Sequence, residues 1–184
     1  MPRRRNRDAV ALLKADHRKV EDLFEKFEKA SRVDIKEALV REICTELSVH
    51  ATIEEEIFYP ACKGQIGDEA LLNEAYVEHD GAKVLIAELI DGDPDMAFYD
   101  AKVKVLAEMI KHHVKEEEKR SEGLFAEARK AGLDFDALGL RMTARKEALK
   151  KELQGSKLPP PRTRSFTGHE LVQSEPLAAR PATA

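Results

Sequence analysis

The chain has 184 residues, of which 42% are hydrophobic and 5% aromatic with no tryptophan, so it can bury one core of mainly aliphatic side chains. Its formal net charge of -4 gives no overall attraction for nucleic acid, and no apolar run approaches the length of a membrane span. We therefore expect a protein in solution, with no nucleic-acid partner and no membrane partner.

The first seven residues carry four arginines, but no apolar segment follows them. They are expected to form a basic leader and not a secretory signal. The two cysteines, Cys44 and Cys62, fall on one predicted helix, roughly 27 Å apart at about 1.5 Å per residue, which is far beyond disulfide reach. Unpaired thiols fit a reducing compartment, so the sequence predicts a cytoplasmic protein.

Four stretches place hydrophobic residues at the three- and four-residue steps of an amphipathic helix. Short stretches with turn and helix-start residues separate them. Short connections join antiparallel neighbours, so the predicted fold is all-α, an up-down-up-down four-helix bundle. The predicted helices cover about residues 8–30, 35–60, 68–91 and 95–118.

The C-terminal third of the chain is predicted to lie outside the bundle. A fifth helix is expected to about Leu153, packed on the outside of the bundle because its apolar positions are sparse. From Gly155 onward, prolines among polar and small residues predict a disordered tail, whose removal should leave helicity and metal content nearly intact. The predicted parts are a basic leader (1–7), a bundle domain (8–130), an accessory helix (131–154) and the tail (155–184).

Two copies of one motif carry the chemistry. In each copy a histidine precedes a glutamate by four residues, so on a helix both side chains leave the same face. A solitary histidine lies 33 residues before the first motif and another lies 34 residues before the second. All six residues lie on the apolar stripes of their helices: His17, His50, Glu54, His79, His113 and Glu117.

The spacing also predicts the height of these residues in the bundle. In antiparallel helices joined by a loop, residues at equal height have their sequence midpoint at that loop. The midpoints of successive histidines are 33.5, 64.5 and 96, inside or beside the three connections. One inward histidine alone would indicate a hydrogen-bonded core residue. Four in one layer, with two carboxylates one turn away, predict a dinuclear metal pocket, because buried carboxylates need partners.

The ligand types narrow the choice of metal. Imidazole and carboxylate without thiolate disfavour a structural zinc site. Two carboxylates that can bridge neighbouring ions suit a pair of iron ions, with manganese as the second choice.

The two halves, together with Glu-Ile-Phe-Tyr-Pro at the end of the first motif, resemble the hemerythrin HHE cation-binding family over about residues 8–129. The resemblance implies a non-haem di-iron centre, bridged by two carboxylates and an oxygen atom, with the six residues above as ligands. It implies binding of, or reaction with, oxygen, nitric oxide or peroxide in sensing or stress response. Iron storage, ferroxidase activity and donation of iron to damaged centres are the alternatives, and weak peroxidase or catalase-like activity stays open.

One departure from the family bears on function. Its oxygen-carrying members have a fifth histidine one turn from the third, whereas here Ala75 and Lys83 occupy the positions one turn either side of His79. This departure favours redox chemistry at open metal positions, or a substitute ligand, over oxygen carriage.

Several assignments have alternatives. His112 and Glu116 have the same spacing as His113 and Glu117, but His113 continues the apolar stripe of its helix, so His112 is kept as a candidate fifth ligand. Tyr59 and Tyr76 are alternative ferric ligands or radical quenchers, against simple packing on a bundle seam. Other acids near the motifs are expected on solvated faces, with support of the imidazoles as the alternative: Glu55, Glu56, Glu116 and Glu118.

Overall fold

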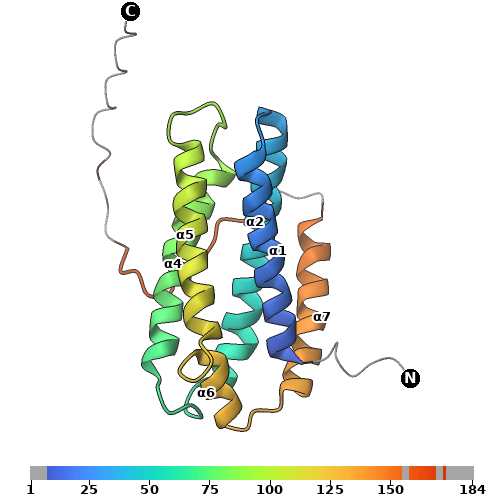
Figure 1. The fold of residues 1–184 in the computed structure, drawn as a ribbon, viewed down its shortest axis with the longest axis vertical. Helices are drawn as coiled ribbons and strands as arrows, with labels where there is room; N and C mark the ends of the chain where they lie inside the picture. The colour runs from blue at the N-terminus through green and yellow to red at the C-terminus, as the bar shows by residue number, and fades with distance from the viewer. Residues whose placement is uncertain (1–7, 155–157, 169–171, 173–184) are drawn as a thin grey trace, which may run out of the picture.

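The computed structural model describes residues 8–154, 158–168 and 172 (Figure 1). Its regular structure consists of helices, and no strand occurs among the described residues. The elements are α1 (Ala9–Lys29), α2 (Val33–Ile53), the π-helix η2 (Glu54–Phe58), α3 (Tyr59–Cys62), α4 (Ala70–Ile90), α5 (Tyr99–Glu118), α6 (Leu124–Lys130) and α7 (Phe135–Leu153).

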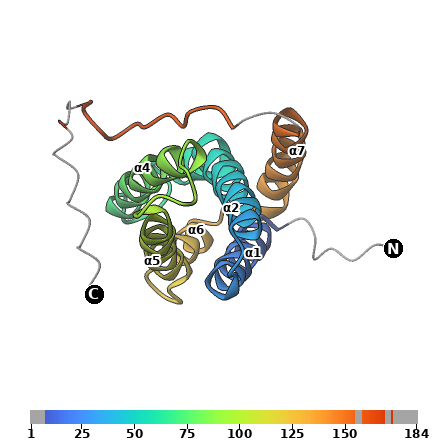
Figure 2. The same cartoon turned by 90° about the horizontal axis from the view of Figure 1, so that it is seen from above.

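Helices α1, α2, α4 and α5 form an antiparallel four-helix bundle. Each packs against its neighbour in the chain, and α1 also packs against α5, which closes the bundle (Figures 1 and 2). The start of α1 follows the usual rule for an N-cap, because the Asp8 carboxylate accepts a hydrogen bond from the Ala11 amide at 2.9 Å. The predicted all-α, up-down-up-down bundle is confirmed.

Two apolar clusters fill the bundle, one on each side of the histidine layer. The cluster near α6 includes Leu13, Ile53, Phe58 and Phe125. The cluster at the other end includes Val20, Ile43, Ile86 and Leu106. The four histidines lie in the sequence between these two sets of positions, so the polar layer is enclosed by apolar side chains in both directions along the bundle.

Helix α2 does not run unbroken to Pro60 as the sequence predicts. It passes at Glu54 into the π-helix η2, and the Tyr59 amide donates to the Glu54 carbonyl. Proline cannot donate a backbone hydrogen bond, and its ring clashes with the carbonyl four residues earlier in an α-helix. A π-helical turn relieves that conflict, and such turns are frequent at functional sites. Here it brings Tyr59 onto the same side as Glu54.

Helix α6 caps the end of the bundle and follows a tight turn. Gly123 allows this turn, because a Cβ atom at this position would lie 2.6 Å from the carbonyl oxygens of Glu116 and Glu117. The Gly123 amide donates to the Lys119 carbonyl at 3.2 Å, so the chain returns closely over the end of α5. Phe125 on α6 then stacks beside His17, with ring centroids 6.0 Å apart.

Helix α7 packs outside the bundle, against α1, α2 and η2 (Figure 2). Its buried side chains include Leu138, Met142 and Leu149, which join the apolar cluster near α6. The predicted extra C-terminal helix on the outside of the bundle is therefore confirmed.

Residues 158–168 differ from the prediction of a disordered tail. They run along the outside of α2 and α4 (Figure 2), and Leu158 packs against an apolar cluster of the bundle. The amides of Arg164 and Ser165 donate to Asp80 at 2.7 and 2.6 Å. Composition identified a segment without a core of its own, but it could not show that buried carboxylates of the bundle would hold it. The predicted leader (1–7) and the rest of the tail, except residue 172, lie outside the described residues.

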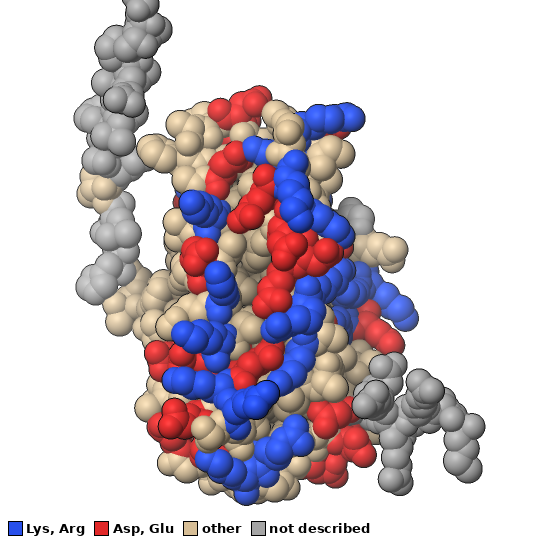
Figure 3. Space-filling model, in the orientation of Figure 1, with Lys and Arg blue, Asp and Glu red and all other residues tan. Residues whose placement is uncertain are grey.

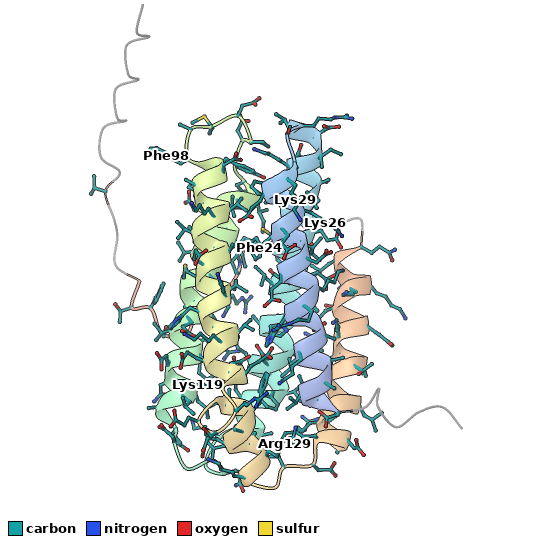
Figure 4. The ribbon with its side chains drawn as sticks, viewed as in Figure 1. Phe24, Lys26, Lys29, Phe98, Lys119 and Arg129 are labelled. Atoms are coloured by element: carbon teal, nitrogen blue, oxygen red, sulfur yellow. The ribbon has the colours of Figure 1, made fainter. Side chains whose placement is uncertain are left out.

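The surface mixes charges of both signs. On the face shown in Figure 3, lysine and arginine side chains alternate with aspartate and glutamate along the helices. Ion pairs one helical turn apart, such as Asp22 with Lys26 and Glu25 with Lys29, account for part of this pattern on α1. Lys26 and Lys29 are labelled in Figure 4. Across the described residues, no helix is both long enough and apolar enough to cross a lipid bilayer.

Candidate metal centre

The bundle brings the four predicted histidines together as two pairs. The Nε2 atoms of His17 on α1 and His50 on α2 lie 3.2 Å apart. The Nε2 atoms of His79 on α4 and His113 on α5 also lie 3.2 Å apart. All four side chains are buried, so each imidazole edge faces the interior of the bundle and not water.

The two predicted glutamates lie between these pairs. One oxygen of Glu54 lies 3.1 Å from His50 Nε2 and 3.4 Å from His79 Nε2. One oxygen of Glu117 lies 3.4 Å from His17 Nε2 and 3.6 Å from His113 Nε2. Each carboxylate therefore contacts one imidazole from each pair. The six predicted residues form one cluster with two overlapping sets of donor atoms.

Two buried oxygens in this cluster, Glu54 Oε1 and Glu117 Oε2, have no hydrogen-bond partner. Buried carboxylate oxygens without partners are costly, and a bound cation would satisfy them. Imidazole nitrogens and carboxylate oxygens are donors that suit iron, manganese and zinc. The residues present thus fit a metal centre with both carboxylates shared.

The buried carboxylates of the cluster also favour positive charge beside them. Burial lowers the pKa of His50 and His79, but Glu54, with Asp16 or Glu55, outweighs burial and raises these pKa values to about 10 and about 9. Burial opposes ionisation of Glu54, yet the His50 and His79 imidazoles hold its pKa well below the usual range. Protons on His50 and His79 therefore supply positive charge that metal ions could supply instead, and metal and protons compete for the nitrogens of these two imidazoles.

Tyr59 lies inside the cluster. Its hydroxyl is 3.0 Å from Glu117 Oε1, 3.3 Å from Glu54 Oε2 and 3.2 Å from His79 Nε2. Burial, with the nearby carboxylates, raises the pKa of Tyr59 well above its usual value. Tyr76 packs its ring against that of Tyr59, with centroids 5.3 Å apart. The structure thus brings Tyr59 to the candidate ligands, whereas Tyr76 lies behind it.

Each imidazole faces a carboxylate on its outer side. His17 Nδ1 is 2.8 Å from Glu118, His79 Nδ1 is 3.0 Å from Glu55, and His113 Nδ1 is 2.7 Å from Glu78. His50 Nδ1 faces Asp16 at the longer distance of 3.5 Å. We call these four acids the supporting carboxylates: Asp16, Glu55, Glu78 and Glu118. Such partners fix the orientation of a metal-binding histidine and raise its basicity.

The supporting carboxylates show where the sequence interpretation was incomplete. Glu55 and Glu118 were expected on solvated faces, with support of the imidazoles only as the alternative, and Asp16 and Glu78 were not considered. Each is the immediate sequence neighbour of a candidate ligand but faces the histidine of another helix. A step of about 100° per residue turns a neighbour of an inward residue toward the adjacent helix, and this signal could have found them.

Other candidates lie outside the cluster. His112 has a side chain that is 60% exposed, and its Nε2 is 3.3 Å from Glu78. Glu56 is exposed and pairs with Arg145 of α7, and Glu116 pairs with Lys119. Lys83, which stands one turn from His79 where a fifth histidine would lie, does not contact the six candidate ligands directly through its ammonium, which donates to Glu55 at 2.6 Å.

A cavity of about 430 Å³ adjoins the cluster. All four histidines line it, together with apolar side chains from the bundle core such as Val20, Leu47, Ile86 and Ile110. Its outer wall is formed by α7 and by residues 158–162 and 164. A molecule in this cavity would reach the imidazoles through an apolar space.

The fold and this arrangement agree with comparisons to known proteins. The model of the hemerythrin HHE cation-binding domain matches residues 8–123. The chain belongs to the hemerythrin HHE cation-binding family. The matched region covers all six candidate ligands and ends at the turn before α6. Hemerythrin-like domains bind metal, and this chain has clusters of His and Glu side chains that could hold a metal ion.

The chain is also similar to two individual proteins. A hemerythrin HHE cation-binding domain-containing protein from Mycobacterium kansasii has a similar crystal structure, with a TM-score of 0.68, 23% identity, and coverage of 79% of this chain and 88% of that one. This likeness shows the hemerythrin-like fold. A DNA nickase from Nostoc sp. is 29% identical over 107 residues, which are 58% of this chain but only 30% of the nickase. The chain thus spans less than a third of that relative.

Proposed function

We propose that this hemerythrin-like chain holds two iron ions, one at His17 and His50 and one at His79 and His113, with Glu54 and Glu117 shared between them. Two iron ions supply redox chemistry toward oxygen, nitric oxide or peroxide. The chain would bind or react with such a molecule in sensing or stress response. Manganese is the second choice of metal for the same donors.

The observation that carries the proposal is the position of the two carboxylates. Each contacts one imidazole from each pair, and each has a buried oxygen without a hydrogen bond. A cluster built for one ion would leave two of the four imidazoles without a role, and buried polar groups without partners are costly. Shared carboxylates between two histidine pairs are therefore better explained by two ions than by one.

The surroundings favour a small neutral ligand. The adjoining cavity has apolar side chains over about half of its lining residues and reaches all four imidazoles. The apolar part of the wall suits a small neutral molecule, because a charge would lose hydration there. The Tyr59 hydroxyl, 3.0 Å from Glu117, is a proton donor inside the cluster. No imidazole occupies the positions one turn from His79, since Ala75 and Lys83 stand there, so we favour reaction over reversible oxygen carriage.

The test is metal analysis followed by spectroscopy. Protein produced with ample iron should contain about two iron ions per chain, as expected for carboxylate-bridged sites in helix bundles. The reduced protein is then mixed with oxygen, nitric oxide or peroxide, one at a time. A reversible absorption band indicates binding, and consumption without a stable adduct indicates turnover. Protein that takes up at most one metal ion per chain would contradict the dinuclear centre.

A further inference from the structure

The C-terminal segment 158–165, which we call the strap, reaches the metal centre from outside the family domain. It crosses the outside of the bundle beside α2 and α4 (Figure 2), and its prolines Pro159, Pro160 and Pro161 line the cavity that leads to the imidazoles. The region matched to the HHE domain ends at residue 123, so the strap is an addition to that domain.

Two buried carboxylates hold the strap. Asp80 Oδ2 accepts hydrogen bonds from the Arg164 amide, the Ser165 amide and the Ser165 hydroxyl, at 2.7, 2.6 and 2.7 Å. Glu55 Oε2 accepts from Arg164 Nε at 2.7 Å. Asp80 is fully buried and Glu55 is 7% exposed. If the strap moved away, these oxygens would exchange its donors for water, and Glu55 would lose a fixed, charged partner.

Glu55 connects the strap to a candidate metal ligand. Its other oxygen, Oε1, is 3.0 Å from His79 Nδ1 and accepts from Lys83 at 2.6 Å. Lys83 also donates to Asp80 at 3.2 Å, so both carboxylates that hold the strap belong to one network. When His79 Nδ1 carries the proton, Nε2 is free to face the metal, and Glu55 fixes that arrangement.

We propose that Arg164 of the strap is a positioning residue of the metal centre, which acts through Glu55 on His79. The inference rests on the proposed di-iron function. It assigns the strap to only one half of the centre. The ion at His79 and His113 depends on the strap, whereas the ion at His17 and His50 is supported by other elements. It also reverses the expectation from composition that the tail can be removed without effect on metal.

The test compares three single variants of the full-length, iron-loaded chain: Arg164→Ala, Arg164→Lys and Arg162→Ala. Arg162 is a matched control, because it lies in the strap and lines the same cavity but has no carboxylate partner among the described residues. Transfer of iron to an excess of a coloured chelator is followed in time, and Mössbauer spectra of the loaded proteins are recorded.

The loss of an outer partner of a metal-binding histidine typically weakens metal binding by about 10- to 100-fold. In Arg164→Ala we expect one of the two ions to leave about tenfold faster, and one Mössbauer doublet to change while the other stays. Arg164→Lys keeps a positive charge near Glu55, so its rate of iron release should lie between those of the parent and Arg164→Ala. Arg162→Ala should match the parent.

Two results would overturn the inference while the di-iron centre stands. One is an Arg164→Ala protein that releases both ions at the parental rate with an unchanged spectrum. The other is equal acceleration of both ions in Arg164→Ala and Arg162→Ala, which would show general opening of the cavity and no action through Glu55. A parent chain that never holds two ions overturns the proposed function itself, and the inference with it.

Discussion

The two halves of the centre have the same inner geometry and different outer support. Both have imidazoles paired at 3.2 Å and share the same two glutamates. In the half at His17 and His50, Lys146 on α7 holds the supporting carboxylate Asp16. In the half at His79 and His113, Arg164 on the strap holds Glu55. Each half is thus supported by a different C-terminal addition to the bundle.

This difference has consequences for dynamics. Helix α7 is regular and buries Leu138, Met142 and Leu149 against the bundle, whereas the strap is irregular, and its residues from 162 to 165 are exposed. Segments with few buried apolar contacts open at lower free-energy cost than packed helices. The half at His79 and His113 should therefore be the half that loosens first. Two similar metal-binding halves can therefore differ in stability because different elements pack around them.

The largest effect should follow removal of a group that both halves share. Glu54→Ala deletes a carboxylate that contacts His50 and His79, so metal binding should weaken in both halves. The number of bound iron ions should fall from about two to less than about one per chain. Metal analysis after gel filtration measures this. Glu56→Ala is the matched control, because Glu56 lies on the same π-helix but pairs with Arg145 on the surface. An unchanged number of iron ions in Glu54→Ala would contradict the proposal that both ions share Glu54.

A smaller loss, confined to one half, should follow a change of one histidine. His113→Ala removes a buried imidazole 3.2 Å from His79 and should lower the content to about one ion per chain, the other half being retained. His112→Ala, at an exposed position, should keep both ions. The reverse result would move the ligand by one residue. Loss of iron in both variants would make His112 a fifth ligand and favour reversible oxygen binding.

The sequence predicted the bundle and the inner cluster because both follow from periodicity. Hydrophobic residues that recur every three or four positions predicted the four helices. Successive histidines are equally far from the loop between them, which predicted that they lie in one layer. The π-helix could not be predicted in this way, because its residues fit the α-helical stripe until Pro60 forces the change. Its effect, the arrival of Tyr59 among the carboxylates, was therefore open from the sequence.

The outer support was harder to predict than the inner cluster. Asp16 and Glu78 were overlooked because acids are common on the surface of a chain that is 36% charged. The strap was missed for another reason. Part of its hold on the bundle comes from the backbone amides of Arg164 and Ser165, and amino-acid composition contains no information on which amides meet a buried carboxylate. Contacts between distant segments without periodicity are the part that only the structure supplies.

Lys146→Ala should have a moderate effect on metal release from the half at His17 and His50, the half that Arg164 does not support. The variant leaves Asp16 without its cation at a buried position, so His50 loses a fixed neighbour, and the ion at His17 and His50 should leave up to about tenfold faster. Chelator kinetics measure this. Lys150→Ala is the control, because Lys150 is one turn away on α7 and pairs with Glu46. Acceleration of the same ion by Lys146→Ala and Arg164→Ala would show that the two halves are not supported separately.

The smallest change in metal content should follow Tyr59→Phe, which tests whether the phenol belongs to one half. The ring stays packed against Tyr76, and the six candidate ligands are untouched, so both ions should remain. The metal-free protein should lose about 1.5–3 kcal/mol of unfolding free energy, because a hydrogen bond to a buried charged group is removed. Denaturant unfolding measures that loss, and Tyr76→Phe serves as the control. Tyr59 contacts His79 directly and reaches the half at His17 and His50 only through the shared carboxylates Glu54 and Glu117, so the larger spectral change should appear in the half at His79 and His113. A different outcome is that Tyr59→Phe loses a visible phenolate-to-iron absorption band and binds fewer than two ions. Tyr59 would then be a metal ligand, and the two halves would differ in their ligands as well as in their outer support.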